Sequence, residues 1–287
     1  MPTARKKPRE AGAKAKERSR RRAGDENAVL LYGRHAVRAA LANPRRRKRR
    51  LYATEEGLKQ LEAIGTKVPA ELPVQLMTRD RLAALLDTAV PHQGCVLEAA
   101  PLSSPPLEAL MPQPGEHPRV LVLDRVEDPR NLGAILRSAA LLGARGVVTT
   151  ARHAPRESGA LARAAAGALD VISWIRVPNL ARALKELAEM GYWRVGLSAA
   201  AVPDEHRAMP ARDVPLAVVL GAEGSGLRPL TRRHLDWELR LAMPGANALL
   251  DSLNVSVAAA LALWTLRPPA ADDTSNQPDG RRSPSQE

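Results

Sequence analysis

The sequence predicts an α/β protein of two domains, a small N-terminal one and a larger one built on a mostly parallel sheet. Three observations lead to this fold class. Short apolar runs alternate with helical stretches over residues 29–267, and a Pro- and Ser-rich stretch at 101–118 reads as a linker between two such regions. The second region contains uninterrupted apolar runs, which are typical of buried parallel strands. A chain of 287 residues with 45% apolar composition can bury a core in each domain.

The two ends of the chain are expected to be disordered. Residues 1–28 contain no Val, Ile, Leu or Phe, so they cannot offset the entropy lost on ordering. Residues 1–24 hold ten Lys and Arg against two Glu, which accounts for +8 of the net charge of +12. This segment is interpreted as a basic RNA-binding arm. Residues 268–287, with their Pro, Asp, Ser and Gln, are expected to form a disordered tail.

Residues 29–100 are expected to form the small α/β domain. Strands are predicted in "VLLYG", "RRLYAT", "PVQLMT" and "GCVLEA", and helices in "RHAVRAALAN", "EEGLKQLEAI" and "RDRLAALLD". Cys95 is the one cysteine of the chain, so it cannot form an intrachain disulfide, and its apolar neighbours predict that it is buried.

Residues 119–267 are expected to form the larger domain. Its first strand is "RVLVLD", and further strands are predicted in "RGVVTT", "VISWIRV", "WRVGLS", "LAVVLG" and "WELRLA". Helices are predicted over Asn131–Gly143, Gly159–Leu169, Leu180–Met190 and Leu253–Leu266. Ligands of such sheets bind beyond the carboxyl ends of the strands, so the loops that leave the strands are the candidate sites.

Two of these loops follow strongly apolar strands. In "LDRVEDPRNLGAILR", Asn131 is predicted to cap a helix, and Arg137 lies off the apolar stripe of that helix. In "LAVVLGAEGSGL", the glycines allow the backbone to approach a ligand closely. This loop lacks the Lys-Ser/Thr of a phosphate-binding loop, and its glycine spacing differs from the dinucleotide-binding pattern.

The third loop precedes the last helix. In "LRLAMPGANALLDSLNVSVAAALALW", Ser252 is predicted to cap the helix. Asn254 and Ser256 are polar residues in an otherwise apolar helix, so their side chains are expected to be hydrogen-bonded.

These three loops resemble motifs of the SPOUT (SpoU/TrmH) family of RNA ribose 2′-O-methyltransferases. The matching segments are "NLGAILR", "VLGAEGSGL" and "MPG…SLNVSVAAA". In the N-terminal domain, "LYGRHAVRAAL" and "PHQGCV" are similar to the L30e-like RNA-binding domain of the branch that methylates a guanosine in the peptidyl-transferase P-loop of bacterial 23S rRNA. The resemblance covers residues 120–266 and parts of the first domain.

The resemblance implies a homodimer that binds S-adenosyl-L-methionine in a deep trefoil knot of the C-terminal α/β domain. Ala242 stands where proline is common, and the loop 244–252 is longer than usual. The implied catalytic residues are Asn131, Arg137, Glu223 and Asn254. The implied cofactor-binding residues are Gly221, Glu223, Gly224, Leu241, Met243, Leu253, Asn254 and Ser256.

RNA is the partner expected from charge and resemblance together. With only 2% aromatic residues, the chain is expected to contact phosphates rather than to stack bases on aromatic rings. The expected RNA-binding residues are Arg34, His35, Arg45, Arg46, Arg47, Lys48, Arg49 and Arg50.

Several alternatives stay open at this point. The fold could serve a non-catalytic rRNA-binding ribosome-assembly factor, or the same chemistry could act on tRNA or as an antibiotic-resistance rRNA methylase. No apolar run approaches the roughly 20 residues of a membrane span, and no signal peptide is recognisable, so a soluble cytoplasmic protein is expected. No metal site is expected.

Overall fold

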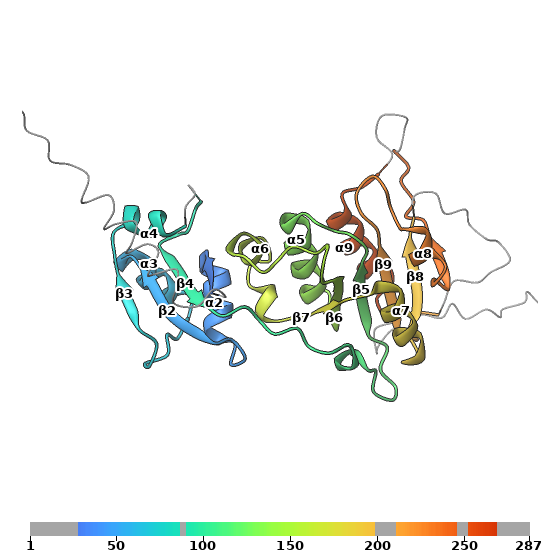
Figure 1. Ribbon diagram of the computed structural model, residues 1–287, viewed down its shortest axis with the longest axis horizontal. Coiled ribbons are helices and arrows are strands. Elements are labelled where there is room, and N and C mark those ends of the chain that lie inside the picture. Colours follow the sequence, from blue (N-terminus) through green and yellow to red (C-terminus); the bar gives the residue numbers. More distant parts are fainter. Residues whose placement is uncertain (1–27, 87–89, 199–210, 246–251, 269–287) are drawn as a thin grey trace, which may run out of the picture. The chain divides into compact units, whose positions relative to one another are not determined.

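The structure is a computed structural model (Figure 1). It describes residues 28–86, 90–198, 211–245 and 252–268. The expected basic arm and C-terminal tail therefore lie outside the described residues, apart from one residue of each. Within the described ranges, no helix is both long enough and apolar enough to cross a membrane.

The chain divides into two compact units. Unit 1 contains the residues up to Ser103 and also the segment Arg156–Asp170. Unit 2 contains Ser104–Pro155 and the residues from Val171 onward. The inclusion of Arg156–Asp170 in unit 1 was not expected from the sequence.

Unit 1 is built on a four-stranded sheet with the strand order β1-β4-β2-β3. Strands β1 and β2 each pair antiparallel with β4, and β3 runs parallel to β2 at the edge. The seven elements expected between residues 29 and 100 are all present. They are β1 (Val29–Tyr32), α2 (Arg34–Ala42), β2 (Lys48–Ala53), α3 (Glu55–Ala63), β3 (Val74–Leu76), α4 (Arg79–Leu85) and β4 (Cys95–Ala99).

The segment from residues 156 to 170 adds helix α6 (Gly159–Ala164) and the 3-10 turn η2 (Ala168–Asp170) to unit 1. Helix α6 packs directly on β1, because a Cβ atom at Gly159 would lie 2.3 Å from the Leu30 carbonyl oxygen. The helix is shorter than the predicted Gly159–Leu169. Ala166 and Gly167 have φ angles of 49° and 98°, which end the right-handed helix.

Unit 2 is built on a six-stranded parallel sheet with the strand order β10-β8-β9-β5-β6-β7. All residues of β5, β6 and β9 are buried, as predicted for their apolar residues, and the buried residues include Arg119, Thr149 and Thr150. The strands are β5 (Arg119–Leu123), β6 (Gly146–Thr150), β7 (Ser173–Val177), β8 (Trp193–Leu197), β9 (Leu216–Leu220) and β10 (Trp237–Leu239).

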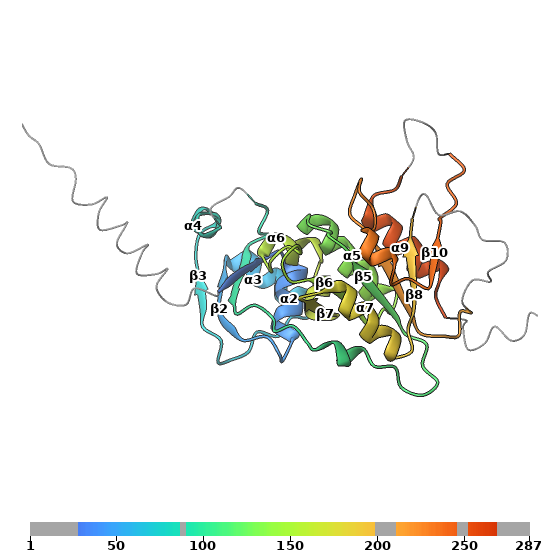
Figure 2. The same cartoon turned by 45° about the vertical axis from the view of Figure 1, so that its right-hand side comes forward.

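Three helices of unit 2, α5, α7 and α9, lie where helices were predicted, whereas η1 and α8 were not predicted. Helices α5 and α9 lie side by side in both views and pack against one another (Figures 1 and 2). Part of the expected linker joins this unit, because Leu107 and Leu110 of η1 are buried in its core. The elements are η1 (Leu107–Leu110), α5 (Pro129–Leu141), α7 (Leu180–Glu189), α8 (Pro229–Arg232) and α9 (Val255–Thr265).

Two predicted helix caps are wrong. Helix α5 begins at Pro129, and its N-cap is Asp128, whose side chain accepts from the backbone N of Arg130. Proline suits the first helical position because its missing N–H needs no partner there. Helix α9 is capped by Asn254 rather than by Ser252.

Candidate functional site

Three loops meet at the carboxyl edge of the unit 2 sheet. Strands β5 and β9 are neighbours, with Leu123 opposite Leu220 at their ends. Strands β6 and β7 lie on one side of β5, and β9, β8 and β10 lie on the other. The connections of the chain therefore run to opposite sides of β5. Ligands of such sheets bind where this reversal occurs, so a ligand is expected in a crevice beyond the ends of β5 and β9.

The side chains of Asn131, Glu223 and Asn254 form a hydrogen-bonded triangle in this crevice. Asn131 Nδ2 and Asn254 Nδ2 both donate to Glu223 Oε1, each at 2.8 Å. Asn254 Nδ2 also lies 3.1 Å from Asn131 Oδ1. Three of the four candidate catalytic residues, one from each loop, are thus brought together.

Asn254 has a second task at the start of α9. Its Oδ1 accepts from the backbone N of Ser256 at 2.9 Å and from the Ser256 hydroxyl at 2.6 Å. The cap uses the oxygen of the amide, and the triangle uses its nitrogen. Asn254 therefore couples the position of α9 to the position of Glu223, and the expectation that Asn254 and Ser256 are hydrogen-bonded is confirmed.

The loop after β9 folds back on itself and requires glycine. A Cβ atom at Gly221 would lie 2.1 Å from the carbonyl carbon of Gly226, so no other residue fits there without movement. Gly224 and Gly226 have φ angles of 82° and 62°, which disfavour other residues. The fold of this loop leaves Glu223 exposed at its tip.

Glu223 and Asn254 line a pocket of about 580 Å³. Ser256 is the one expected cofactor-binding residue that does not line it. Those that do are Gly221, Glu223, Gly224, Leu241, Met243, Leu253 and Asn254. The apolar walls are extended by Leu197 at the end of β8, by Leu220 of β9 and by Val255 and Ala258 of α9, which were not among the expected cofactor-binding residues.

A buried carboxylate holds the base of the glycine loop. Asp124 follows β5 and is 0% exposed. Its side chain accepts from Arg228 Nε at 2.7 Å and from the Thr231 hydroxyl at 2.6 Å, and its backbone N donates to the Leu220 carbonyl at 2.8 Å. Asp124 is thus bonded to residues on both sides of the loop. The local sequence does not indicate this role of Asp124, since Arg228 and Thr231 are more than 100 positions away.

A buried arginine holds the other end of α9. Arg119 donates to the carbonyl oxygens of Leu266 and Val214, the latter at 2.8 Å. Burial, with a smaller contribution from the charge of Arg212, lowers the pKa of Arg119 to about 10. This contact ties the C-terminal end of α9 to the start of β5, while Asn254 ties its N-terminal end to the glycine loop and to α5.

Family comparisons assign both parts of the chain. Residues 118–264 match the model of the SpoU rRNA methylase family, and residues 30–105 match the model described as RNA 2′-O ribose methyltransferase substrate binding. The chain belongs to the SpoU rRNA methylase family.

Curated relatives and solved structures agree with this membership. The 23S rRNA (guanosine-2′-O-)-methyltransferase RlmB of Pseudomonas putida is 35% identical over 243 residues, which are 82% of this chain and 94% of that protein. The protein of the same name from Ralstonia nicotianae is 37% identical, with shares of 82% and 93%. An AdoMet-bound rRNA methyltransferase from Sinorhizobium meliloti has the same fold, with a TM-score of 0.67, 22% identity and coverage of 86% and 89%.

The fourth catalytic candidate of this SpoU family member lies apart from the triangle. Arg137 is exposed on α5 and does not line the pocket. Among the described residues, its guanidinium has no hydrogen-bond or ion-pair partner. The structure of one chain therefore does not place Arg137 together with Asn131, Glu223 and Asn254.

The expected RNA-binding residues all belong to unit 1, which contains the matched substrate-binding segment. His35, Arg45, Arg47 and Arg50 are exposed. The remaining residues of the set are partly buried, namely Arg34, Lys48 and Arg49, except for Arg46.

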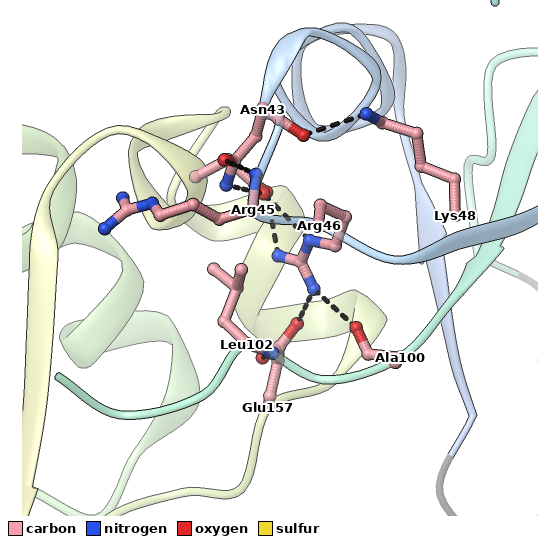
Figure 3. A network of polar contacts seen from close by, with 8 residues as sticks. Asn43, Arg45, Arg46, Lys48, Ala100, Leu102 and Glu157 are labelled. Carbon is pink, nitrogen blue, oxygen red and sulfur yellow. Dashed lines mark hydrogen bonds and ion pairs between the residues drawn. The ribbon is translucent and has the colours of Figure 1, made fainter.

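Arg46 is the one member of this set that the structure contradicts. Its side chain is 0% exposed and forms ion pairs with Glu157 (Figure 3) and with Asp170. It also donates to the Ala100 carbonyl at 3.2 Å. Burial opposes the charge, but the hydrogen bonds and charges of Asp170 and Glu157 more than offset it, so the pKa of Arg46 lies above its ordinary value. Arg46 therefore fastens the segment from 156 to 170 to the N-terminal part of unit 1 and is not available to RNA.

Proposed function

We propose that this chain transfers the methyl group of S-adenosyl-L-methionine to a ribose 2′-hydroxyl of rRNA, and that its target is a guanosine of the peptidyl-transferase P-loop of 23S rRNA. Membership of the SpoU rRNA methylase family and the names of the RlmB relatives support the reaction. The observation that carries the proposal is the pocket in which Glu223 and Asn254, from different loops, stand together on one wall.

The pocket suits this methyl donor. Its volume of about 580 Å³ is in the range of small-molecule sites, and its leucine, valine and methionine side chains suit an adenosine group. Glycines let the backbone approach the ligand. Glu223 Oε1 is used by two amides, and Oε2 has no partner among the described residues. The carboxylate places negative charge on the wall, which favours a donor that carries a positive sulfonium group.

The residues supply position and charge rather than covalent chemistry. The bound donor supplies an activated methyl group, which passes to the ribose oxygen while S-adenosylhomocysteine leaves. Holding the two reactants in line can account for up to about 7–11 kcal/mol of the barrier. A guanidinium group offers N–H donors and no acceptor, so we assign Arg137 to the adjacent phosphate and the developing alkoxide. The hydroxyl proton then passes to water or to a phosphate oxygen.

The proposal includes a homodimer with composite active sites. Val257, Leu261 and Trp264 of α9 and Leu141 of α5 are 43–76% exposed, an unusual number of large apolar side chains on two adjacent helices. A second copy that covers this face would remove them from water. Arg137, which lies away from the triangle of its own chain, would then act from the partner.

The proposal also includes two features of the fold. We infer that unit 2 is knotted as a deep trefoil at its C-terminal end, and that unit 1 is an L30e-like domain. The family match over 118–264 supports the first, and the four-stranded sheet with the substrate-binding match over 30–105 supports the second.

Three alanine variants test the division of roles. Glu223→Ala and Asn254→Ala should weaken S-adenosylmethionine binding in calorimetry, whereas Arg137→Ala should bind the donor normally and lose turnover. Arg182→Ala, which removes an exposed arginine of α7, is the control. Equal losses of donor affinity in all three variants would contradict these roles. Mapping ribose methylation of rRNA from cells with and without the gene tests the target.

Subunit mixing tests the composite site. Arg137→Ala and Asn254→Ala subunits, when exchanged, form heterodimers in which one site carries both changes and the other carries neither. Methylation should reappear on mixing. If native mass spectrometry shows heterodimers and activity stays at the level of the separate variants, the two residues act within one chain.

A further inference from the structure

Unit 1 contains a hollow of about 690 Å³ that the proposed function does not use. It is formed by the start of α3, the end of β3, the start of α4, and two short stretches around Arg34 and Gly94. All of these elements belong to unit 1, so the hollow is complete within it. Its volume is in the range of sites that hold one small organic group.

The floor of the hollow is rigid. The backbone N of Thr54 donates to the Gly94 carbonyl at 2.9 Å, and the Thr54 side chain accepts from the backbone N of Gly57 at 2.9 Å. A Cβ atom at Gly57 would lie 2.1 Å from the Gly94 oxygen, so α3 and this turn are in direct backbone contact. The hollow is therefore formed before any ligand arrives, which lowers the entropic cost of binding.

Three cationic side chains line this hollow, namely Arg34, Lys59 and Arg79. Within the described ranges, none of the three has a hydrogen-bond or ion-pair partner on its charged group. The Nε atom of Arg34 is also shielded from solvent without a partner. A shielded N–H without an acceptor is unfavourable, so an anionic oxygen in the hollow would stabilise it.

Two carboxylates line the same hollow. Glu55 and Glu56 occupy the first turn of α3, and Glu56 Oε1 accepts from Gln60 Nε2 at 2.8 Å. These groups disfavour a bare phosphate and favour a ligand that also presents N–H donors. Leu76, at the end of β3, is 54% exposed and lines the hollow beside Met77, which provides an apolar surface.

We propose that this hollow binds one unstacked nucleotide of the substrate RNA. The phosphate meets Arg34, Lys59 and Arg79, and the base lies on Leu76 with its N–H donors toward Glu55 and Glu56. Guanine fits this arrangement well, because its Watson–Crick edge presents two adjacent N–H donors. A single nucleotide fits a hollow of this size, whereas a duplex does not enter it. The inference rests on RNA being the substrate of the proposed function.

Matched charge removals test the phosphate contact. Lys59→Gln and Arg79→Gln each remove a cation from the hollow, and Lys67→Gln and Arg81→Gln remove exposed cations of the same unit that do not line it. The salt dependence of binding to a 23S rRNA fragment is measured with the full-length protein. Each hollow variant should lower the log–log slope by about 0.7–0.9, and the controls should change it much less.

The carboxylates provide a second test, in which the expected change in RNA affinity is opposite to the ordinary effect of removing a negative charge. Near RNA, removal of a negative charge ordinarily strengthens binding, because repulsion of phosphates is relieved. If Glu55 and Glu56 hold a base, the double variant Glu55→Gln/Glu56→Gln should instead weaken RNA binding several-fold. Glu62→Gln, an exposed residue near the end of α3, is the control and should leave binding unchanged or strengthen it.

The outcomes separate this inference from the proposed function. S-adenosylmethionine affinity and thermal stability are measured for every variant, and both should stay at the wild-type values. Wild-type protein that does not bind or methylate the RNA would overturn both proposals. Wild-type protein that methylates the RNA, together with hollow variants that behave as their controls do, would overturn the nucleotide site alone and leave the hollow to a non-RNA ligand.

Discussion

Replacing Arg46 by methionine tests how unit 1 holds the segment from 156 to 170. The Arg46 guanidinium donates to both carboxylate oxygens of Asp170, at 2.8 and 2.9 Å, and also pairs with Glu157. The two carboxylates are only 2% exposed. Methionine fills a similar volume but leaves both negative charges buried without a cation.

The expected loss follows from this burial. Removing one partner of a buried ion pair costs about 3–5 kcal/mol, because the remaining charge stays desolvated. Asp170 keeps a bond from Asn43 Nδ2 at 2.9 Å, and Glu157 keeps one from the backbone N of Leu102 at 2.7 Å, so we expect the lower half of that range. A loss of about 3–4 kcal/mol is a large fraction of the roughly 5–15 kcal/mol of a typical domain. In a unit of this size it corresponds to a decrease in Tm on the order of 15 °C.

The assay can separate the two units, because the four tryptophans, at positions 174, 193, 237 and 264, all belong to unit 2. Calorimetry with tryptophan fluorescence should show the unit 1 transition moving down while the fluorescence transition and S-adenosylmethionine affinity change little. Arg47→Met is the matched control. Arg47 is exposed, so its loss should leave Tm unchanged and lower the salt slope of RNA binding.

Adding Glu157→Gln and Asp170→Asn to Arg46→Met should restore much of the stability, since no buried charge then remains. The reasoning is refuted if Arg46→Met lowers Tm by no more than Arg47→Met does. It is also refuted if the triple variant is less stable than the single one.

Two further predictions concern buried groups. Thr231→Val should weaken S-adenosylmethionine binding several-fold, because the Thr231 hydroxyl that bonds to Asp124 helps to hold the glycine loop. Thr231→Ser keeps the hydroxyl and should bind normally. Equal affinities of the two variants in calorimetry would contradict this role. Cys95 should resist iodoacetamide at pH 8 in the native protein and react in denaturant, because burial raises the pKa of its thiol from 9.0 to about 12. Since the unfolded thiol ionises near pH 9 and the folded one does not, the free energy of unfolding should decrease as the pH rises above 9. A Cys95→Ala variant with the same alkaline decrease would show that the thiol is not its cause.

Much of the local structure was predictable from periodicity and apolar runs. The segments "RVLVLD", "RGVVTT" and "LAVVLG" each contain a run of apolar residues, and the strand within each is a fully buried parallel strand. Cys95 is buried as predicted. The helix caps were mispredicted because Asn131 and Ser252 are as good local caps as Asp128 and Asn254. Asn131 instead donates to Glu223, a contact that the local sequence does not reveal.

The candidate site was accessible from the sequence only through its three motifs. Glycines after an apolar strand indicate a loop where backbone approaches a ligand, and Asn254 is conspicuous as a polar residue in an apolar helix. Neither observation shows that Asn131, Glu223 and Asn254 share one hydrogen-bonded triangle. Their meeting depends on the strand order, which places β9 beside β5. The two strands are far apart in the chain, since β5 ends at Leu123 and β9 begins only at Leu216.

Arg46 shows the limit most clearly. In the run of six basic residues from 45 to 50, composition assigns every member to a solvated, RNA-facing patch. The local sequence does not distinguish Arg46 from Arg45 or Arg47. Burial of Arg46 is decided by Glu157 and Asp170, which lie 111 and 124 positions away and belong to the segment whose helix α6 packs on β1. Short-range patterns determine helices, strands and glycine turns, whereas charge pairing in the interior depends on which distant segments the fold brings together.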